Sequence, residues 1–118
     1  MWEVEYTNEF QVWWESLLEA QQDAIAAAIE ILEEKGPALG RPLVDSITSS
    51  RHRNMKELRP GTTNSLRVLF AFDPRRSAIL LTSGGKTGRW RTWYEEFIPI
   101  ADKLYDDHLR ELREEGVI

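Results

Sequence analysis

Three short apolar segments in the middle of the chain, separated by turn-forming residues, restrict the fold more than any other feature. They cover residues 55–59, 66–73 and 78–82. Pro60-Gly61 and Asp73-Pro74 stand between them, and connections this short join neighbouring antiparallel strands. Ser83-Gly84-Gly85 is expected to break the last segment. The sequence therefore predicts a three-stranded antiparallel meander.

The residues before the meander predict a strand followed by helical structure. Residues 2–6 alternate apolar and acidic side chains, which is the period of a half-buried strand. Apolar residues at helical spacing then cover residues 10–32, as two helices or as one helix that bends at residues 19–23. Gly36-Pro37 ends this segment, and residues 38–54 are expected to form a loop.

A last helical pattern over residues 90–112 follows the meander, with Pro99 at a helix start or a kink. The predicted order is therefore β-αα-βββ-α. This is an α+β fold, in which an N-terminal strand and two helices pack on a small, mainly antiparallel sheet, with a C-terminal helix. The 118 residues suffice for one domain, residues 1–118.

Composition excludes several classes of protein and site. The chain has no cysteine, which excludes disulfide scaffolds, thiolate metal sites and cysteine nucleophiles. The apolar run at residues 24–29 is far shorter than the about 20 residues of a spanning helix, and the acidic start lacks a signal-peptide core. We expect a cytoplasmic protein with no membrane partner. The two histidines have no metal-ligand spacing, and no phosphate-binding glycine loop is present, so we expect no metal and no cofactor.

The net charge of −5 divides unevenly along the chain. Residues 41–91 contain eleven Lys and Arg against three acidic residues, a net charge of +8, whereas the remaining residues carry −13. A basic segment between acidic flanks favours an anion-binding face. An ordinary solvated surface is the alternative.

Several of these cations lie where strands and loops meet. Arg67 interrupts an apolar strand, so it faces either a specific partner or, in an alternating strand, the solvent. Lys86 and Arg89 follow a glycine pair, where backbone amides can join them in binding a phosphate. Trp93 and Tyr94 come next, and both offer a face for stacking on unpaired bases, although Trp93 also suits the core.

A second basic group lies at the start of the meander. Its members are Arg51, His52 and Arg53 in the preceding loop, and Lys56 and Arg59 on the strand. Lys56 and Arg59 are three residues apart and should point to opposite faces of a regular strand. We predict an RNA-binding set made of Arg51, His52, Arg53, Arg59, Arg89 and Trp93.

These residue types suit a cleavage of RNA that needs no metal. The 2′-hydroxyl next to the phosphate attacks it, a base removes the hydroxyl proton, an acid protonates the leaving oxygen, and cations stabilise the crowded phosphate. Lys56 or His52 is the candidate base, and Tyr94 is a candidate acid or stacking residue. An ordinary loop position is the alternative for His52, and His108 is expected at the surface of the last helix.

Several segments together resemble the HigB-type, phage-derived branch of the RelE toxin superfamily. They are residues 50–59 (SRHRNMKELR), 66–76 (LRVLFAFDPRR), 85–87 (GKT), 90–94 (WRTWY) and 98–102 (IPIAD). The resemblance extends over nearly the whole chain. One departure is that RelE itself has two lysines around Lys56-Glu57, a pattern that Glu57 interrupts here.

The resemblance implies a RelE-like fold and the toxin of a type II toxin–antitoxin pair. Such toxins enter the ribosomal A site and cut messenger RNA there without a metal or other cofactor. A small helix-turn-helix antitoxin is the implied partner, and direct DNA binding is expected only through it.

By the same resemblance, Arg67 contacts the scissile phosphate and Lys86 supplies a second cation. Tyr94 corresponds to the C-terminal aromatic residue, a position that Trp93 fits equally well by its spacing from Gly85. With Lys56, the residues Arg67, Lys86 and Tyr94 form the predicted catalytic set. The alternative function is a non-catalytic module that binds RNA, ribosomes or an acidic protein through the same basic face.

Overall fold

The computed structural model describes residues 1–61, 65–85 and 88–118, and it has the predicted α+β architecture. Its centre is a five-stranded sheet in the order β1-β5-β4-β3-β2. The strands are β1 (Val4–Tyr6), β2 (Val44–Ser46), β3 (Met55–Leu58), β4 (Leu66–Phe72) and β5 (Ala78–Gly85). β1 pairs in parallel with β5 and the other neighbours are antiparallel, so the sheet is mainly antiparallel, as predicted.

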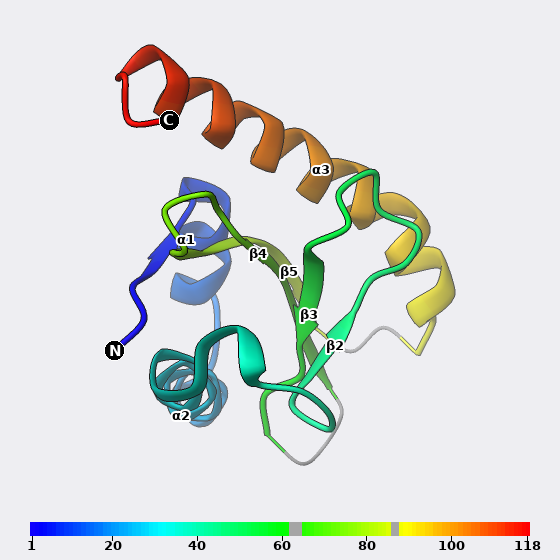
Figure 1. Ribbon diagram of the computed structural model, residues 1–118. Helices are drawn as coiled ribbons and strands as arrows, with labels where there is room; N and C mark the ends of the chain where they lie inside the picture. The colour runs from blue at the N-terminus through cyan, green and yellow to red at the C-terminus, as the bar shows by residue number, and fades with distance from the viewer. Residues whose placement is uncertain (62–64, 86–87) are drawn as a thin grey trace.

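Helices cover both faces of this sheet (Figure 1). They are α1 (Asn8–Glu15), α2 (Glu19–Lys35) and α3 (Trp90–Glu114), with a 3₁₀ turn at Gly36–Ala38. The first helical pattern is therefore two helices rather than one bent helix, and Pro99 lies inside α3. Among the described residues, no helix combines the length and the apolar character needed to span a membrane.

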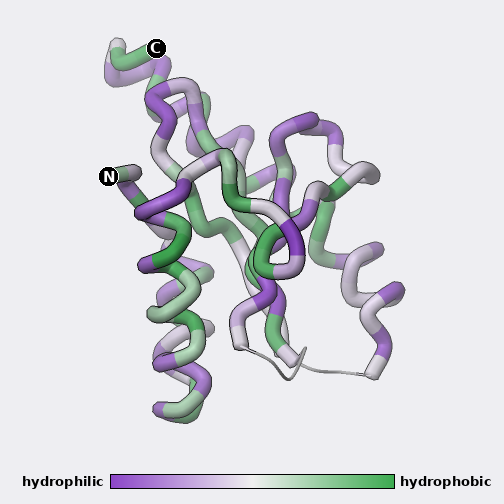
Figure 2. The backbone as a smooth tube through the Cα atoms, turned by 60° about the horizontal axis from the view of Figure 1, so that its bottom comes forward, coloured by the Kyte–Doolittle hydropathy of each residue, from purple (hydrophilic) through white to green (hydrophobic). Residues whose placement is uncertain are grey.

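Alternate residues of β4 face the two helical layers. Val68 and Phe70 pack with α1 and α2, whereas Leu69 and Ala71 pack with α3. Each helix has one face on the sheet, and green and purple alternate along the helical segments in Figure 2 accordingly. Because side chains alternate along a strand, the odd-numbered Arg67 belongs to the α3 face.

The strands differ from the prediction in two places. β2 lies inside the segment that was expected to be a loop, because a strand of three residues is too short to produce a periodic signal. β5 continues through Gly84 and Gly85 instead of ending before them. Gly84 pairs with Arg67, and a Cβ atom on it would lie 2.1 Å from Trp93 Nε1, so this glycine allows a close approach of α3 to the sheet.

Candidate functional site

A buried polar cluster lies between the sheet and the first turns of α3. The Tyr94 hydroxyl donates a hydrogen bond to Glu57 Oε1 at 2.6 Å, and Arg67 Nε lies 3.1 Å from both of these oxygens. Arg59 Nε approaches the same Glu57 oxygen at 3.2 Å. The side chains of Arg67 and Glu57 are each only 5% exposed. We call these four residues, Glu57, Arg59, Arg67 and Tyr94, the Arg67 cluster.

Strand register and helical spacing bring the cluster together. Glu57 pairs with Leu69, a residue of the α3 face, so its side chain shares that face with Arg67. On α3, Trp90 and Tyr94 are four residues apart and therefore lie on one side of the helix. The Trp90 ring covers the Arg67 guanidinium, whose Cζ is 4.4 Å from the ring centroid. This cation–π contact covers the cluster from the helix side.

The cluster holds two guanidinium groups around one carboxylate. Burial raises the pKa of Tyr94, the hydrogen bond to Glu57 raises it further, and Arg67 opposes part of this rise. The Glu57 hydrogen bond also raises the pKa of Arg59, against a smaller effect of burial. At neutral pH the tyrosine is therefore a neutral hydroxyl beside charged arginines. Arginine pairs readily with both carboxylate and phosphate oxygens, so the cluster is built to hold an anion.

Two of the predicted catalytic residues, Arg67 and Tyr94, are in contact in this cluster. Lys56 pairs with Phe70, which packs against α1 and α2, so Lys56 lies on the opposite face of the sheet. Arg59 reaches Glu57 on the α3 side, and the two basic residues therefore point to opposite faces, as their spacing predicted. Lys86 lies outside the described residues.

Arg51 and His52 attach the loop before β3 to the middle of α3. Arg51 Nη2 and His52 Nε2 lie 2.6 Å and 2.7 Å from the two oxygens of Asp106, and Ser50 Oγ donates to Asp102 Oδ1 at 2.5 Å. Asp106 is twelve residues beyond Tyr94, or about 18 Å along a helix. The structure therefore does not bring His52 to the Arg67 cluster.

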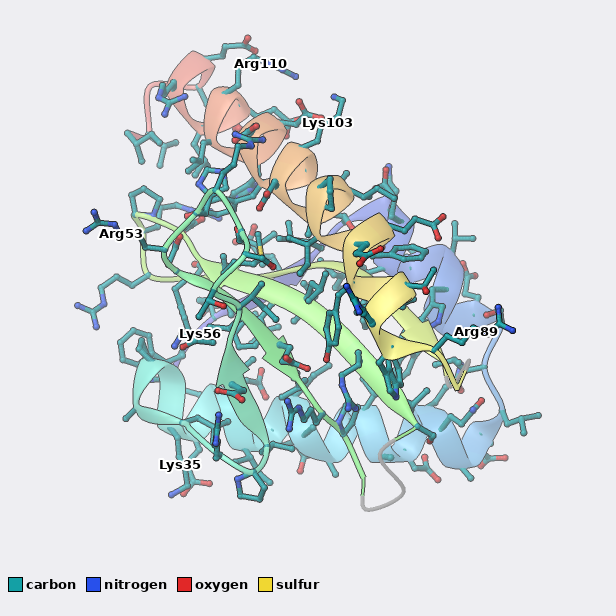
Figure 3. All side chains as sticks on the ribbon, turned by 90° about the vertical axis from the view of Figure 1, so that its right-hand side faces the viewer. Lys35, Arg53, Lys56, Arg89, Lys103 and Arg110 are labelled. Carbon is teal, nitrogen blue, oxygen red and sulfur yellow. The ribbon has the colours of Figure 1, made fainter. Side chains whose placement is uncertain are left out.

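The other predicted RNA-binding residues do not form one surface. Arg53 and Arg89 are exposed, and they lie on opposite sides of the view in Figure 3. Trp93 is 5% exposed and packs in the core below α3, stacked on Phe97, which agrees with its alternative interpretation as a core residue. Arg59 alone of that set belongs to the Arg67 cluster.

Most of the described basic segment is matched by carboxylates. Six of its cations have ion pairs: Arg41, Arg51, Arg59, Arg67, Arg75 and Arg91. Some of the partners, such as Asp106 and Glu5, belong to the acidic flanks. The separation of charges along the sequence is thus partly cancelled by the fold.

Glu57 is the member of the cluster that sequence reasoning did not identify. It is one of only three acidic residues among positions 41–91, and it lies in a strand otherwise read as apolar and basic. It also shares strand parity with Arg59. Those two signals together could have marked it as a buried partner for the cations.

A second buried carboxylate, Asp73, ties the β4–β5 turn to α3. His108 Nε2 lies 2.8 Å from Asp73 Oδ2, Arg75 Nη2 lies 2.7 Å from that oxygen, and the Ser77 amide donates to Oδ1. The expectation that His108 lies at the surface is wrong, because its side chain is only 15% exposed in this contact. Burial by itself raises the pKa of Asp73, but the hydrogen bonds from His108, Arg75 and Ser77 outweigh it and lower the pKa.

We expect Asp73→Asn to lower the free energy of unfolding at pH 7 by about 1–3 kcal/mol, because hydrogen bonds to a charged group are lost. A carboxyl whose pKa is lowered by folding stabilises the protein above its unfolded pKa, and this contribution disappears as the pH falls through the folded value. Urea denaturation between pH 7 and pH 3 should therefore show a weaker loss of stability in acid for the variant than for the wild type. Asp23→Asn, at an exposed position of α2, is the control, and equal acid slopes in wild type and D73N would contradict the prediction.

Comparison with known proteins adds to this geometry. The family of phage-derived, Gp49-like proteins (DUF891) matches residues 12–106 of the chain. The chain is 51% identical over 109 residues to "Putative toxin HigB2" of Mycobacterium tuberculosis, covering 91% of this chain and 54% of that relative. It is 50% identical over 97 residues to "Putative toxin HigB3" of the same organism, covering 82% of this chain and 84% of that relative. The chain thus spans about half the length of the first of these relatives.

Proposed function

The chain belongs to the family of phage-derived, Gp49-like proteins, and from that premise we propose that it is the toxin of a type II toxin–antitoxin pair. We further propose that it acts as a ribosome-dependent endoribonuclease, which cuts messenger RNA by attack of a 2′-hydroxyl and so inhibits translation. The assignment as a toxin is supported by two relatives that share about half of their aligned residues with this chain and are both named putative toxins. The Arg67 cluster supports the assignment as an endoribonuclease.

The observation that carries the proposed reaction is that the side chains of Arg59, Arg67 and Tyr94 all meet at the Oε1 atom of Glu57. Two guanidinium groups compensate the charge that develops on a phosphate during attack, and each such donor contributes about 10²–10³-fold to the rate. Tyr94 is held in its neutral form by its raised pKa, so it has a proton to give to the leaving oxygen. Lys86 remains a proposed further cation.

Access to the cluster is restricted in this structure. Arg67 is 5% exposed and lies beneath the Trp90 ring, so RNA reaches its guanidinium only if the first turn of α3 moves. We therefore expect the cluster to bind free RNA weakly. On the ribosome, the message would be held in a fixed orientation next to the toxin. Tight binding of RNA by the toxin itself would then not be needed.

The proposed partners follow from this function. A toxin of this kind is kept inactive by a cognate antitoxin, for which a small helix-turn-helix protein is our proposal, and DNA is contacted only through that protein. The ribosome and its bound message are the proposed targets, in the cytoplasm. Because the nucleophile is the substrate's own 2′-hydroxyl, the proposed reaction requires no metal or cofactor.

The experiment that tests this function is induced expression in a bacterial host, followed by primer-extension mapping in translated and untranslated copies of one message. We expect cuts in the translated copy alone, with 2′,3′-cyclic phosphate and 5′-hydroxyl ends. A 5′-phosphate end would indicate attack by water and contradict the mechanism. Intact messages, with the protein folded and bound to ribosomes, would instead support the non-catalytic binding module.

A further inference from the structure

The proposed reaction needs a base, and the described structure narrows the choice to one residue of the Arg67 cluster. Arginine stays protonated in proteins, and Tyr94 keeps its proton because burial and Glu57 raise its pKa. Of the two bases suggested by the sequence, Lys56 lies on the other face of the sheet and His52 is paired with Asp106. Within the cluster, the Glu57 carboxylate is the group with lone pairs available to accept a proton.

We propose that Glu57 is the general base of the cleavage reaction and that its hydrogen bond with Tyr94 returns the proton after each cut. This inference rests on the proposed function, since it names the group that activates the nucleophile at that same site. It assigns Glu57 a catalytic role in addition to its role as counter-ion of Arg59 and Arg67.

The step balances with the residues at hand. The O–H bond of the 2′-hydroxyl breaks and its proton goes to Glu57, while the 2′-oxygen forms a bond to phosphorus. The bond from phosphorus to the 5′-oxygen of the next nucleotide breaks, and that oxygen takes the proton of the Tyr94 hydroxyl. The products are a 2′,3′-cyclic phosphate and a 5′-hydroxyl.

This leaves Glu57 protonated and Tyr94 as a phenolate, with 2.6 Å between their oxygens in the resting structure. Transfer of one proton along this hydrogen bond restores both groups. Because phenolate is far more basic than carboxylate, the return is strongly favoured. No solvent exchange is required, which suits a cluster that is buried beneath Trp90.

The arginines explain how a carboxylate in an ion pair becomes a base only when RNA is bound. In the resting structure Arg59 and Arg67 both reach Glu57 Oε1, so this oxygen is occupied by the two guanidinium groups. A phosphate entering the cluster competes for the same guanidinium groups, because arginine binds phosphate and carboxylate oxygens alike. As these hydrogen bonds move to the phosphate, Oε1 of Glu57 is released to accept the proton of the 2′-hydroxyl.

The test is single-turnover cleavage of a message on programmed ribosomes by wild type, Glu57→Gln and Glu57→Asp. Glutamine keeps the size of the side chain and can still accept from the arginines, but it cannot take a proton. We expect Glu57→Gln to cleave about 10²–10⁴-fold more slowly. Ribosome binding should stay within a few fold of wild type, and aspartate should keep part of the rate. Glu95→Gln, an exposed carboxylate next to Tyr94 on α3, is the matched control and should cleave normally.

The pH profile separates a base from a structural counter-ion. The wild-type rate should fall tenfold per pH unit on the acid side, as a single base is protonated, and the residual rate of Glu57→Gln should be flat there. If Glu57→Gln fails to fold, as judged by its thermal melt, Glu57→Asp decides. A reduced rate that keeps the acid limb is expected, because aspartate is still a carboxylate, and a folded Glu57→Asp protein without an acid limb would overturn the inference. A folded Glu57→Gln protein that cleaves within tenfold of wild type with the same acid limb would also overturn it.

Failure of the proposed function would look different. A wild-type protein that leaves the message intact on ribosomes overturns the nuclease and the base together. A wild type that cuts, alongside a Glu57→Gln protein that cuts equally well, overturns the base alone.

Discussion

Replacing Arg67 with alanine is expected to reduce single-turnover cleavage by about 10²–10³-fold and to lower the free energy of unfolding by about 3 kcal/mol. The rate falls because the guanidinium that would stabilise the phosphate is gone. The stability falls because Glu57, whose side chain is 5% exposed, loses its buried cation and keeps only the partly exposed Arg59 as an ion-pair partner. Arg59 and Tyr94 still bind that carboxylate, which keeps the loss at the lower end of the range for a broken buried ion pair. Urea denaturation and ribosome-bound cleavage measure the two effects separately.

Arg91→Ala is the matched control for this prediction. Arg91 is also an arginine paired with a glutamate, but its side chain is 93% exposed on α3, and exposed pairs contribute little to stability. We expect wild-type cleavage and a change in unfolding free energy within about 0.5 kcal/mol. If Arg67→Ala cleaved as fast as Arg91→Ala, Arg67 would have no part in the reaction.

Gly84→Ala is expected to lower the free energy of unfolding by about 2–3 kcal/mol, although it adds only one methyl group. The new Cβ would lie 2.1 Å from Trp93 Nε1 and 2.6 Å from Cε2 of the same ring, too close for either atom to remain in place. Because Trp93 contacts both Trp90 and Tyr94, its displacement should also slow cleavage. Chemical denaturation and near-ultraviolet circular dichroism of the tryptophans would measure the change.

The neighbouring glycine provides a control in the same strand. A Cβ on Gly85 would have no heavy atom within 4 Å, so Gly85→Ala should leave stability unchanged or raise it slightly through a less flexible unfolded chain. If Gly84→Ala and Gly85→Ala were equally stable, the packing of Trp93 would not require a glycine at position 84.

The parts of the fold that were predictable are those with a repeated pattern. The meander, the helical structure before it and α3 all follow from apolar spacing and turn residues, and they are confirmed. The spacing left open whether the first helical pattern is one bent helix or two, and the structure has two. β2 was missed because three residues cannot display a period. The glycines of β5 look like a strand break in sequence, and only the position of Trp93 reveals that they accommodate a packed ring.

The candidate site was predictable only in part, because it depends on which face of the sheet each side chain occupies. Arg67 and Tyr94 were identified as single residues, and their contact depends on strand register and on α3 crossing that face. The alternation of side chains predicted that Lys56 and Arg59 point to opposite faces of the sheet. It did not predict which of the two shares a face with Arg67. Glu57 was not predicted as a site residue, because a single acidic residue within a basic segment matches no known sequence motif.

The pairing of β1 with β5 also has a consequence for the order of folding during synthesis. Val4 pairs with Ala78, so β1 has no strand to pair with until β5 has been synthesised. The Arg67 cluster is completed later still, when Tyr94 of α3 arrives. Contacts between residues so distant in sequence form slowly, since a long loop must close before they are gained. A growing chain therefore acquires the assembled cluster only after Tyr94 has been made, when the residues that precede it are already available for a partner to bind.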